Sequence, residues 1–579
     1  MPRHDSENSA EGHVFSRIGC ALRVSLASGY GARQLRTDIL AGLVVGVVAL
    51  PLAMALAIAS GVPPQHGLYT SIVAGALIAL CGGSRVCVSG ATAAFVVLLV
   101  PISAHYGIGG LLLASMMSGL ILCGLGIARL GRLIQFIPHP VTTGFTAGIG
   151  VVIAGMQLKD FLGLRPESDP AHFTERIVAY AQALPTVHGS EVAIGTFTLI
   201  VLVLWPRFVR SIPAPLVGLA AASVAAFVLA HTVAGFEVAT IGSRFGGIPH
   251  ALPAFDWPWN LPGADGTPIG CSMSTLRALL PPAIAMAMLG AIVSLMCAVV
   301  ADGIAGTRHD PDAELFAQGL GNVVAPLFGG IAAAGAIART TTGIRAGARS
   351  PISAFSHAAF VLLAVLAVAP ILAHLPMAAM AALLLLVAWN MADMPHFFHI
   401  VRVAPKGDVA VLLTCFVLTV AVDMTVAVSA GVVLASLLFM KRMSEMFHAA
   451  PEETRHAGTL DPMLDDVIVY VIRGPLFFGA ADKAVGALTR VKSKTRAVIL
   501  KMDDVPVMDV TGLVALESAI QRLRKAGIFV AIAGVQAQPR SVMERGGIRT
   551  DANWIVVCDS DEQALALVTA KLNPKPPRA

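Results

Sequence analysis

Two short stretches of the sequence place groups suited to anion binding inside apolar surroundings. The first is VSGATAAFVV, residues 88–97, in which Ser89-Gly90-Ala91-Thr92 has the residue types of a helix start. The second is AAAGAIARTTTGIRAG, residues 332–347, which adds the guanidinium of Arg339. A helix start carries unpaired backbone N–H groups and the positive end of the helix dipole. Two such starts that face each other beside an arginine would form an anion site.

A simpler interpretation competes at each stretch. Gly, Ser and Thr also let membrane helices pack closely, and small residues at this spacing are frequent in the chain. Arg339 could instead extend to the cytoplasmic interface and line no cavity. A charged side chain inside a membrane is costly, so function is the default interpretation of Arg339.

The composition around these stretches is that of a membrane protein. Of 579 residues, 56% are hydrophobic and 13% are charged, and the mean hydropathy is +0.77. A soluble protein of this size needs more surface charge. The net charge of +5 is small and dispersed, so we expect no nucleic-acid partner. None of the eight cysteines forms a CxxC pair, so we expect no zinc site, no disulfide framework and no cofactor.

The apolar runs predict fourteen membrane segments. Twelve are apolar helices, although several are shorter than the ~20 residues that cross a bilayer: 38–60, 66–81, 108–128, 138–157, 191–206, 214–235, 276–301, 316–332, 351–373, 376–392, 408–425 and 426–440. Two more, 88–101 and 334–344, are shorter and begin with small or polar residues. Arg and Lys gather in every second connection, which predicts both termini on the cytoplasmic side of a lipid bilayer.

The segment count divides into two halves of seven. Segments three and ten, 88–101 and 334–344, hold equivalent positions in these halves, and both are short and interrupted. This arrangement is typical of inverted-repeat transporters, in which broken helices meet near the membrane midplane. We therefore predict an all-α polytopic membrane domain over 36–442, preceded by a cytoplasmic segment over 1–35 that lacks the features of a signal peptide.

From Asp465 onward the pattern changes to that of a small α/β domain. The runs DVIVYVIRG, RAVILKM and IFVAIAG indicate strands, whereas LVALESAIQRLRKAG and DEQALALVTAKL indicate helices. We expect a linker over 443–464 and a cytoplasmic α/β domain over 465–575. The tail has no phosphate-binding loop, dinucleotide fingerprint or nucleophile elbow, so we expect no enzyme activity.

One position in this tail has two interpretations. In VMDVTGLVAL, residues 507–516, Asp509 and Thr511 are placed to open a helix. In one interpretation the two residues only cap the helix. In the other, the hydroxyl of Thr511 is a phosphorylation site that switches the state of the tail.

Several stretches together resemble the SulP family of anion transporters. They are ALPLAMALAIASGVPPQHGLY (49–69), GGSRVCVSGATAAFV (82–96), GFTAGIGVVIAGMQLKDFLG (144–163), QGLGNVVAPLFGGIAAAGAIART (318–340) and the tail's MDVTGL. The resemblance extends over nearly the whole chain, and the tail is similar to a STAS domain. Within the family, AMAMLGAI, AALLLLVAWNM and VVLASLLFMKRM are most similar to the bacterial branch that takes up C4-dicarboxylates such as succinate, fumarate and aspartate.

The resemblance implies a seven-plus-seven inverted repeat with a core and a gate domain, a homodimer in the bacterial inner membrane, and elevator-like alternating access. The substrate-binding positions that it implies are Leu52, Leu56, Ala91, Thr92, Ala93, Ala336, Ile337, Ala338, Arg339 and Thr340. Backbone N–H groups of the two helix starts would hold carboxylate oxygens, Arg339 would supply charge, and the two leucines would form a wall. The family's tail can be phosphorylated at the position of Thr511, where a cytoplasmic regulatory protein could bind.

Two positions depart from the family pattern. Relatives typically have proline where Ala91 stands, at the expected first helical position, where its missing N–H is not needed. Relatives also commonly carry a glutamate in the eighth segment, where this chain has Val293. The carboxylates counted in the predicted spans stand only near segment ends, at Asp38, Asp302, Asp408 and Asp423. We therefore expect transport without a coupling ion, or with a proton carried by the substrate, and His357 is the alternative coupling group.

The leading hypothesis is a secondary transporter of small carboxylates, above all C4-dicarboxylates. Sulfate and bicarbonate are alternatives, because their oxygens satisfy the same N–H groups. A nucleobase permease shares the fold, but it usually lacks the soluble tail. A membrane-anchored STAS signalling protein without transport is the alternative of another class, and the intact Arg339 and helix starts argue against it.

Overall fold

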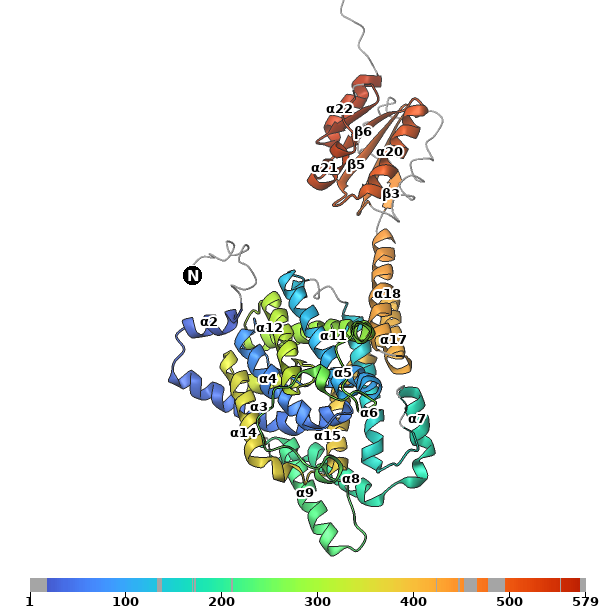
Figure 1. Ribbon diagram of the computed structural model, residues 1–579. Helices are drawn as coiled ribbons and strands as arrows, with labels where there is room; N and C mark the ends of the chain where they lie inside the picture. Colours follow the sequence, from blue (N-terminus) through green and yellow to red (C-terminus); the bar gives the residue numbers. More distant parts are fainter. Residues whose placement is uncertain are drawn as a thin grey trace, which may run out of the picture. The chain divides into compact units, whose positions relative to one another are not determined.

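A computed structural model of the chain describes residues 18–132, 138–168, 170, 173–209, 212–422, 424–445, 448–451, 466–476, 495–551 and 553–572. The chain divides into two compact units, Met1–Val432 and Val433–Ala579 (Figure 1). Most of the predicted linker 443–464 lies outside the described residues, as do the first 17 residues of the predicted N-terminal segment.

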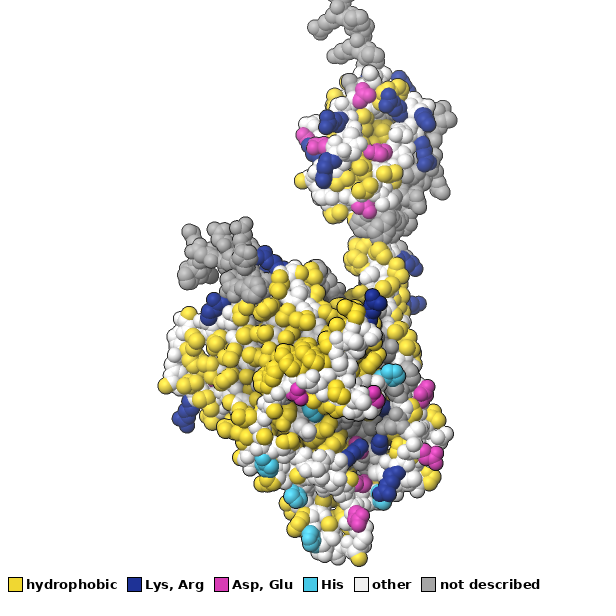
Figure 2. Space-filling model, in the orientation of Figure 1, with side chains coloured by type: hydrophobic (Ala, Val, Ile, Leu, Met, Phe, Trp, Pro, Cys, Tyr) yellow, Lys and Arg dark blue, Asp and Glu magenta, His cyan; other side chains and the backbone are white. Residues whose placement is uncertain are grey.

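All fourteen predicted segments are present as apolar helices; thirteen lie in the membrane unit, Met1–Val432, and the last, α18, crosses the boundary of that unit. They are α3 (Ala32–Ala59), α4 (Gln65–Cys81), the two parts of α5 (Ala93–Ile127), α6 (His139–Leu162), α8 (Gly189–Phe208), α9 (Ala214–Thr232), α11 (Met273–Ala305), α12 (Pro311–Val324), α13 (Ile337–Arg345), α14 (Pro351–Leu372), α15 (Met377–Ala392), α17 (Lys406–Ala421) and α18 (Met424–Glu445). In the described part of the chain, nine helices are long and apolar enough to cross a membrane. Figure 2 shows apolar side chains over much of the visible face of this unit, as a multi-pass membrane protein requires.

Segments three and four are joined in α5 across a kink at Gly107. Its φ of 66° lies in the left-handed region, which glycine adopts without steric cost. A Cβ at this position would lie 2.3 Å from the carbonyl carbon of Gly263. The connection that follows α9 therefore packs directly on the kink, and only glycine leaves room for it.

The chain before the first segment and the connections between segments contain short elements that the apolar pattern did not predict. They are α2 (Cys20–Ala27), α7 (Phe173–Gln182), α10 (Ile241–Phe245), α16 (Met394–Val403) and the 3-10 turns η2 (Leu184–Thr186), η3 (Pro258–Asn260) and η4 (Ala325–Phe328). Most of them lie outside the long apolar runs, so a prediction of membrane spans from hydropathy does not include them.

The membrane helices pack in two groups. In the core group, α5 packs against α11 and α12, and α14 packs against α3 and α4. In the gate group, α6 packs against α15 and α17, and α8 packs against α9 and α15. Glycines allow the helices to approach closely: a Cβ at Gly119 of α5 would lie 2.6 Å from the amide nitrogen of Val323 on α12. Such small-residue packing holds helices together where lipid offers no hydrophobic driving force.

Two very short strands join the halves of the repeat. β1 (Ser89–Gly90) pairs antiparallel with β2 (Ala334–Gly335), and Ser89 stands opposite Gly335. The N–H of Ala336 donates to the carbonyl of Val88 at 2.9 Å, which extends the ladder by one bond. An antiparallel pair has a local two-fold relation, so the ladder fits the inverted repeat. Each strand then leads into one of the two half-helices.

The C-terminal unit contains a five-stranded sheet in the order β3 (His448–Pro451), β4 (Val467–Arg473), β5 (Ala497–Asp504), β6 (Phe529–Ala533) and β7 (Ile555–Cys558). β3 is antiparallel to β4, and the other pairs are parallel. Helices α20 (Val510–Lys525) and α21 (Ala537–Arg545) share one cluster of buried apolar residues with the sheet, and α22 (Asp561–Leu572) shares another. The predicted α/β domain is confirmed, although β3, α21 and β7 were not predicted.

Candidate functional site

The first half-helix begins two residues later than the sequence predicts. Thr92 is the N-cap residue, with a φ of −128°, and α5 begins at Ala93. The prediction that Ala91 is the first helical position is therefore wrong. The carbonyl of Ala91 instead accepts a hydrogen bond from the guanidinium of Arg339. The N–H groups of Ala93 and Ala94 lie in the first turn of the helix, where backbone N–H groups have no acceptor within the helix.

The second half-helix, α13, has nine residues and begins after Ala336. Its first turn consists of Ile337, Ala338 and Arg339, whose side chains differ in accessibility. Ile337 is 37% exposed, whereas Arg339 is 2% exposed. The side chain of Ile337 is thus accessible at the helix start, and the guanidinium is turned into the protein.

Arg339 lies between the two helix starts with donors to spare. A Cβ added to Gly90 would lie 2.6 Å from its Nη1, so the guanidinium covers the backbone of β1. Its Nε and Nη1 are buried and have no hydrogen-bond partner within the described part of the chain. Arg339 therefore does not extend to the membrane interface. Buried donors without partners in a native fold point to a water or an ion that occupies the site.

Thr340 and two cysteines form the inner wall behind this arginine. The hydroxyl of Thr340 accepts the N–H of Val88 at 2.9 Å and lies 3.2 Å from the Sγ of Cys297. The Sγ atoms of Cys297 and Cys87 are 3.3 Å apart, and both thiols are free. Thr340 is fully buried, and these contacts hold β1 to α13.

Helix α11 supports the second helix start. The Oγ of Ser294 accepts the N–H of Gly335 at 3.0 Å. Val293, where the family resemblance led us to expect a glutamate, is the partly buried neighbour of Ser294. Position 293 thus stands beside a residue that holds β2, but its own side chain is apolar.

The remaining predicted positions lie on α3 and α14. Leu56 is buried, and Leu52 is half-buried one turn before it. His357 of α14 is fully buried. His357 also lies within electrostatic reach of Arg339. The core group therefore buries two nitrogen-rich side chains near each other.

Three buried carboxylates escaped the sequence analysis: Glu314, Glu191 and Asp312, which is 2% exposed in the first turn of α12. Glu314 and Glu191 lie in the first turns of α12 and α8 and are 1% and 7% exposed. Segment nine was predicted over 316–332, whereas α12 spans Pro311–Val324, so Glu314 fell outside the predicted span. The error arises because hydropathy rejects a first turn that holds Asp312 and Glu314. Asp423 lies outside the described residues.

Glu314 fixes the connection that precedes β1. Its Oε2 accepts the N–H groups of Gly83 and Ser84 at 3.0 and 3.1 Å. The amide of Gln318, one turn later, donates to Glu314 at 3.0 Å and to the Oγ of Ser89 at 2.7 Å. Backbone donors and an amide thus compensate the buried carboxylate.

Asn322 continues the same stripe toward the other strand. Its amide donates to the carbonyl of Ala333 at 2.8 Å, and its oxygen accepts the N–H of Ala333. The stripe of Glu314, Gln318 and Asn322 therefore holds both strands from one helix. Residues four apart on a helix lie on one face, and this spacing was the signal available in the sequence.

In the tail, Asp509 is the N-cap of α20 and accepts the N–H of Gly512 at 2.7 Å. Thr511 is exposed in the first turn of that helix. The plain cap therefore belongs to Asp509, and the hydroxyl of Thr511 is accessible.

Comparison with known proteins gives two family matches. Residues 35–415 match the Sulfate permease family, and residues 462–555 match the STAS domain. The "Putative sulfate transporter YvdB" of Bacillus subtilis is 38% identical over 523 residues, which cover 90% of this chain and 95% of that protein. The "Bicarbonate transporter BicA" of Picosynechococcus sp. is 30% identical over 539 residues, which cover 89% of this chain and 91% of that protein.

Solved structures agree with the fold. The overall structure of SLC26A9 has a TM-score of 0.80 at 17% identity, and the match covers 99% of this chain and 98% of that one. The transmembrane domain of a cyanobacterium bicarbonate transporter BicA has a TM-score of 0.60 at 26% identity, over 70% of this chain and 98% of that one.

Proposed function

The chain belongs to the sulfate permease family, and from that premise we propose that it is a secondary transporter of small anions. One observation carries the proposal: Arg339 is buried between two helix starts with two N–H-bearing nitrogens unpartnered. A guanidinium and helix N-termini bind anions by charge-assisted hydrogen bonds, which are roughly twice as strong as neutral ones. An anion that binds there would satisfy the donors that the described residues leave free.

Sulfate and bicarbonate are the first substrates to test, because those anions are named for YvdB and BicA. C4-dicarboxylates are the second candidate, and they were the first expectation from the sequence. The relatives described above do not support that branch. What favours dicarboxylates is the exposed apolar side chain of Ile337 at the second helix start, which suits a ligand with methylene groups.

The proposed movement is elevator-like, with the core group as the moving body. The β1–β2 ladder, Glu314, Gln318 and Asn322 tie both helix starts to the core helices. A site held in this way can travel with its helices past the gate group without being dismantled. We further propose a homodimer in the bacterial inner membrane with both termini cytoplasmic, and Thr511 as the point at which a cytoplasmic protein regulates the tail.

We propose that anion transport is not coupled to an ion bound at position 293. Val293 cannot titrate, so the surviving mechanisms are exchange, facilitated movement, or entry of a proton on the substrate. His357 and Glu314 are two of the buried ionisable groups of the core group, and a pH dependence of the protein itself would be tested first at these two residues.

Uptake by purified protein in liposomes tests the proposal. Labelled sulfate, bicarbonate, succinate, fumarate and aspartate would be compared at several pH values, with and without a proton gradient. We expect saturable uptake of at least one inorganic oxyanion. Uptake of dicarboxylates alone would restore the first expectation, and uptake of none would favour a membrane-anchored signalling protein.

A further inference from the structure

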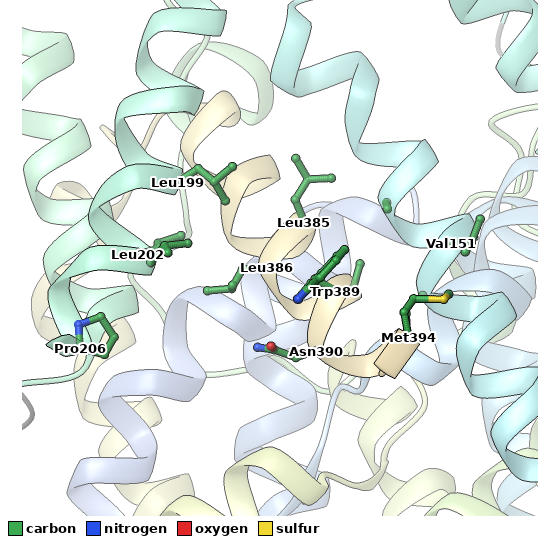
Figure 3. Close-up of a pocket in the computed structure, with 14 residues that line it drawn as sticks. Val151, Leu199, Leu202, Pro206, Leu385, Leu386, Trp389, Asn390 and Met394 are labelled. Carbon is green, nitrogen blue, oxygen red and sulfur yellow. The ribbon is translucent and has the colours of Figure 1, made fainter. Parts of the chain in front are cut away.

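The gate group contains an apolar groove away from the anion site. It has a volume of about 790 Å³ and lies between α6, α8 and α15. Figure 3 shows Leu199, Leu202 and Pro206 of α8 facing Leu386 and Trp389 of α15 across it. Among its fourteen lining residues, Asn390 is the one with an amide side chain, and none is charged. We call this the gate groove.

The lining decides what chemistry the gate groove accepts. A transported anion finds no charged group there, and water does not stably fill an apolar cavity without polar partners. The groove is open on the side of two membrane-spanning helices, because Val203 is 46% exposed and Trp389 is 66% exposed. The apolar groups that meet these helices in a bilayer are the acyl chains of lipids.

The position of the gate groove restricts it to one leaflet. From Leu199 to Pro206 a helix rises ~10 Å, whereas one leaflet contributes ~15 Å of hydrocarbon. Pro206 lies near the end of α8 at Phe208. The groove therefore runs from the membrane interface at that end toward the midplane, as one acyl chain does.

Groups suited to a lipid headgroup stand at the interfacial end. Arg207 follows Pro206 directly and is exposed in the last turn of α8. Exposed arginines at a membrane surface attract anionic headgroups by ~1 kcal/mol each. Trp389 has the amphipathic ring that settles at this depth. The lining ends at Met394, where α16 begins.

The floor of the gate groove is closed by tight packing, which distinguishes it from a shallow dent. A Cβ at Gly150 of α6 would lie 2.7 Å from the Cβ of Ala392 and 2.8 Å from the carbonyl oxygen of Ala388 on α15. α6 and α15 thus meet without a gap at the floor of the groove, and α8 forms its other wall. We propose that the gate groove binds one acyl chain of a glycerophospholipid from the leaflet on the Arg207 side, with its phosphate near Arg207.

A cavity-filling variant tests this proposal. Ala154 lines the groove from α6, so Ala154→Phe should occupy it. The matched control is Val224→Phe on α9, because Val224 is 63% exposed and does not line the groove. Full-length proteins would be purified in mild detergent, and retained phospholipid per chain would be counted by native mass spectrometry. We expect Ala154→Phe to lose a phospholipid that the native protein and the control retain.

A second variant and a second measurement keep the proposal falsifiable. If Ala154→Phe fails to fold, Val151→Phe fills the same groove from the same helix. Arg207→Gln should keep the lipid but lose the preference for phosphatidylglycerol over phosphatidylcholine in mixed vesicles. Equal lipid retention by native and folded groove-filled protein would overturn the proposal. Conversion of a dimer to a monomer by Ala154→Phe, with lipid unchanged, would also overturn it and assign the groove to a second copy.

Discussion

The two helix starts of the core group share a backbone arrangement and differ in chemistry. Each follows a two-residue strand, and the strands pair with each other. The first start carries no ionisable side chain and offers the Ala91 carbonyl, whereas the second supplies Arg339. The repeat thus provides two sets of N–H donors, but the charge comes from one half. The site is symmetric in its backbone and asymmetric in its electrostatics.

The two starts also differ in how they are held. Gln318 holds the first strand through Ser89, and Asn322 and Ser294 hold the second. The first helix runs from Ala93 to the kink at Gly107, whereas α13 ends after nine residues. A short helix gains little stability from its own hydrogen bonds, so the second start depends more on its neighbours. The following substitutions should separate these contributions.

Arg339→Ala should have the largest effect, because it removes the charge that distinguishes the second start. Hydrogen bonds to charged groups contribute ~1.5–3 kcal/mol each, and the loss of two would lower anion uptake ~100-fold or more. Arg345→Ala, in the exposed last turn of the same helix, is the matched control. Uptake at equal protein would be measured in liposomes. Native-like uptake by folded Arg339→Ala protein would place Arg339 outside the site.

Val293→Glu should have the next largest effect, because it adds a negative charge beside the residue that holds β2. At neutral pH the carboxylate would repel the anion and lower uptake ~10-fold or more. Protonation of the carboxyl as the pH falls would remove the repulsion, so uptake should recover in acid. Val293→Gln is the control. A pH profile like that of native protein would show that position 293 is remote from the anion.

Gly90→Ala tests the contribution of the first half, because it changes the backbone of β1 that Arg339 covers. Its Cβ would lie 2.6 Å from Nη1 of Arg339 and 3.2 Å from the Oγ of Ser71, so the guanidinium must shift. Overpacking of this kind costs ~1–3 kcal/mol, and we expect anion affinity to fall ~10-fold. Gly124→Ala is the control, because no atom lies within 4 Å of the added Cβ. Unchanged affinity in calorimetry would mean that the guanidinium has free room.

Thr340→Val should lower stability more than binding. It removes the acceptor of the Val88 N–H, and a buried unsatisfied donor costs ~1–3 kcal/mol. We expect a lower thermal unfolding temperature and nearly native anion affinity in the folded protein. Thr341→Val controls for loss of the hydroxyl on the same helix. A large loss of affinity with unchanged stability would instead make Thr340 an anion ligand.

Ala91→Pro should have the smallest effect, because Ala91 precedes the helix. Proline at a compatible position changes stability by ~0.4–1 kcal/mol, so uptake should change less than ~5-fold. The carbonyl that accepts from Arg339 is retained. A tenfold loss of uptake in folded protein would show that the N–H of Ala91 binds the anion.

Much of the fold follows from the apolar pattern. The fourteen segments, the interrupted pair and the α/β tail are all present, because hydrophobic length and period record what lipid and a packed sheet require. The position of Arg339 beside the first helix start agrees with the expectation that the two starts meet.

The missed features depend on compensation between residues far apart in the sequence. Glu314 stays buried because Gly83 and Ser84, some 230 positions earlier, donate to it. No local pattern records that pairing, so the start of α12 was misplaced. Thr92 has the residue type of a cap, but Ser89 is an equally good cap, so the local sequence did not decide that the helix begins at Ala93. The partner of Arg339 was likewise visible only in three dimensions.

The β1–β2 ladder also constrains how the protein is made. Gly90 leaves the ribosome well before Ala334, its partner in the ladder. At ~5–20 residues per second, synthesis of the chain between them takes ~10–50 s. During that interval the first strand sits in the nascent membrane domain with an unpaired edge, and the guanidinium that will cover it does not yet exist. The anion site can therefore form only after the second half has been inserted, because β2 and Arg339 belong to that half.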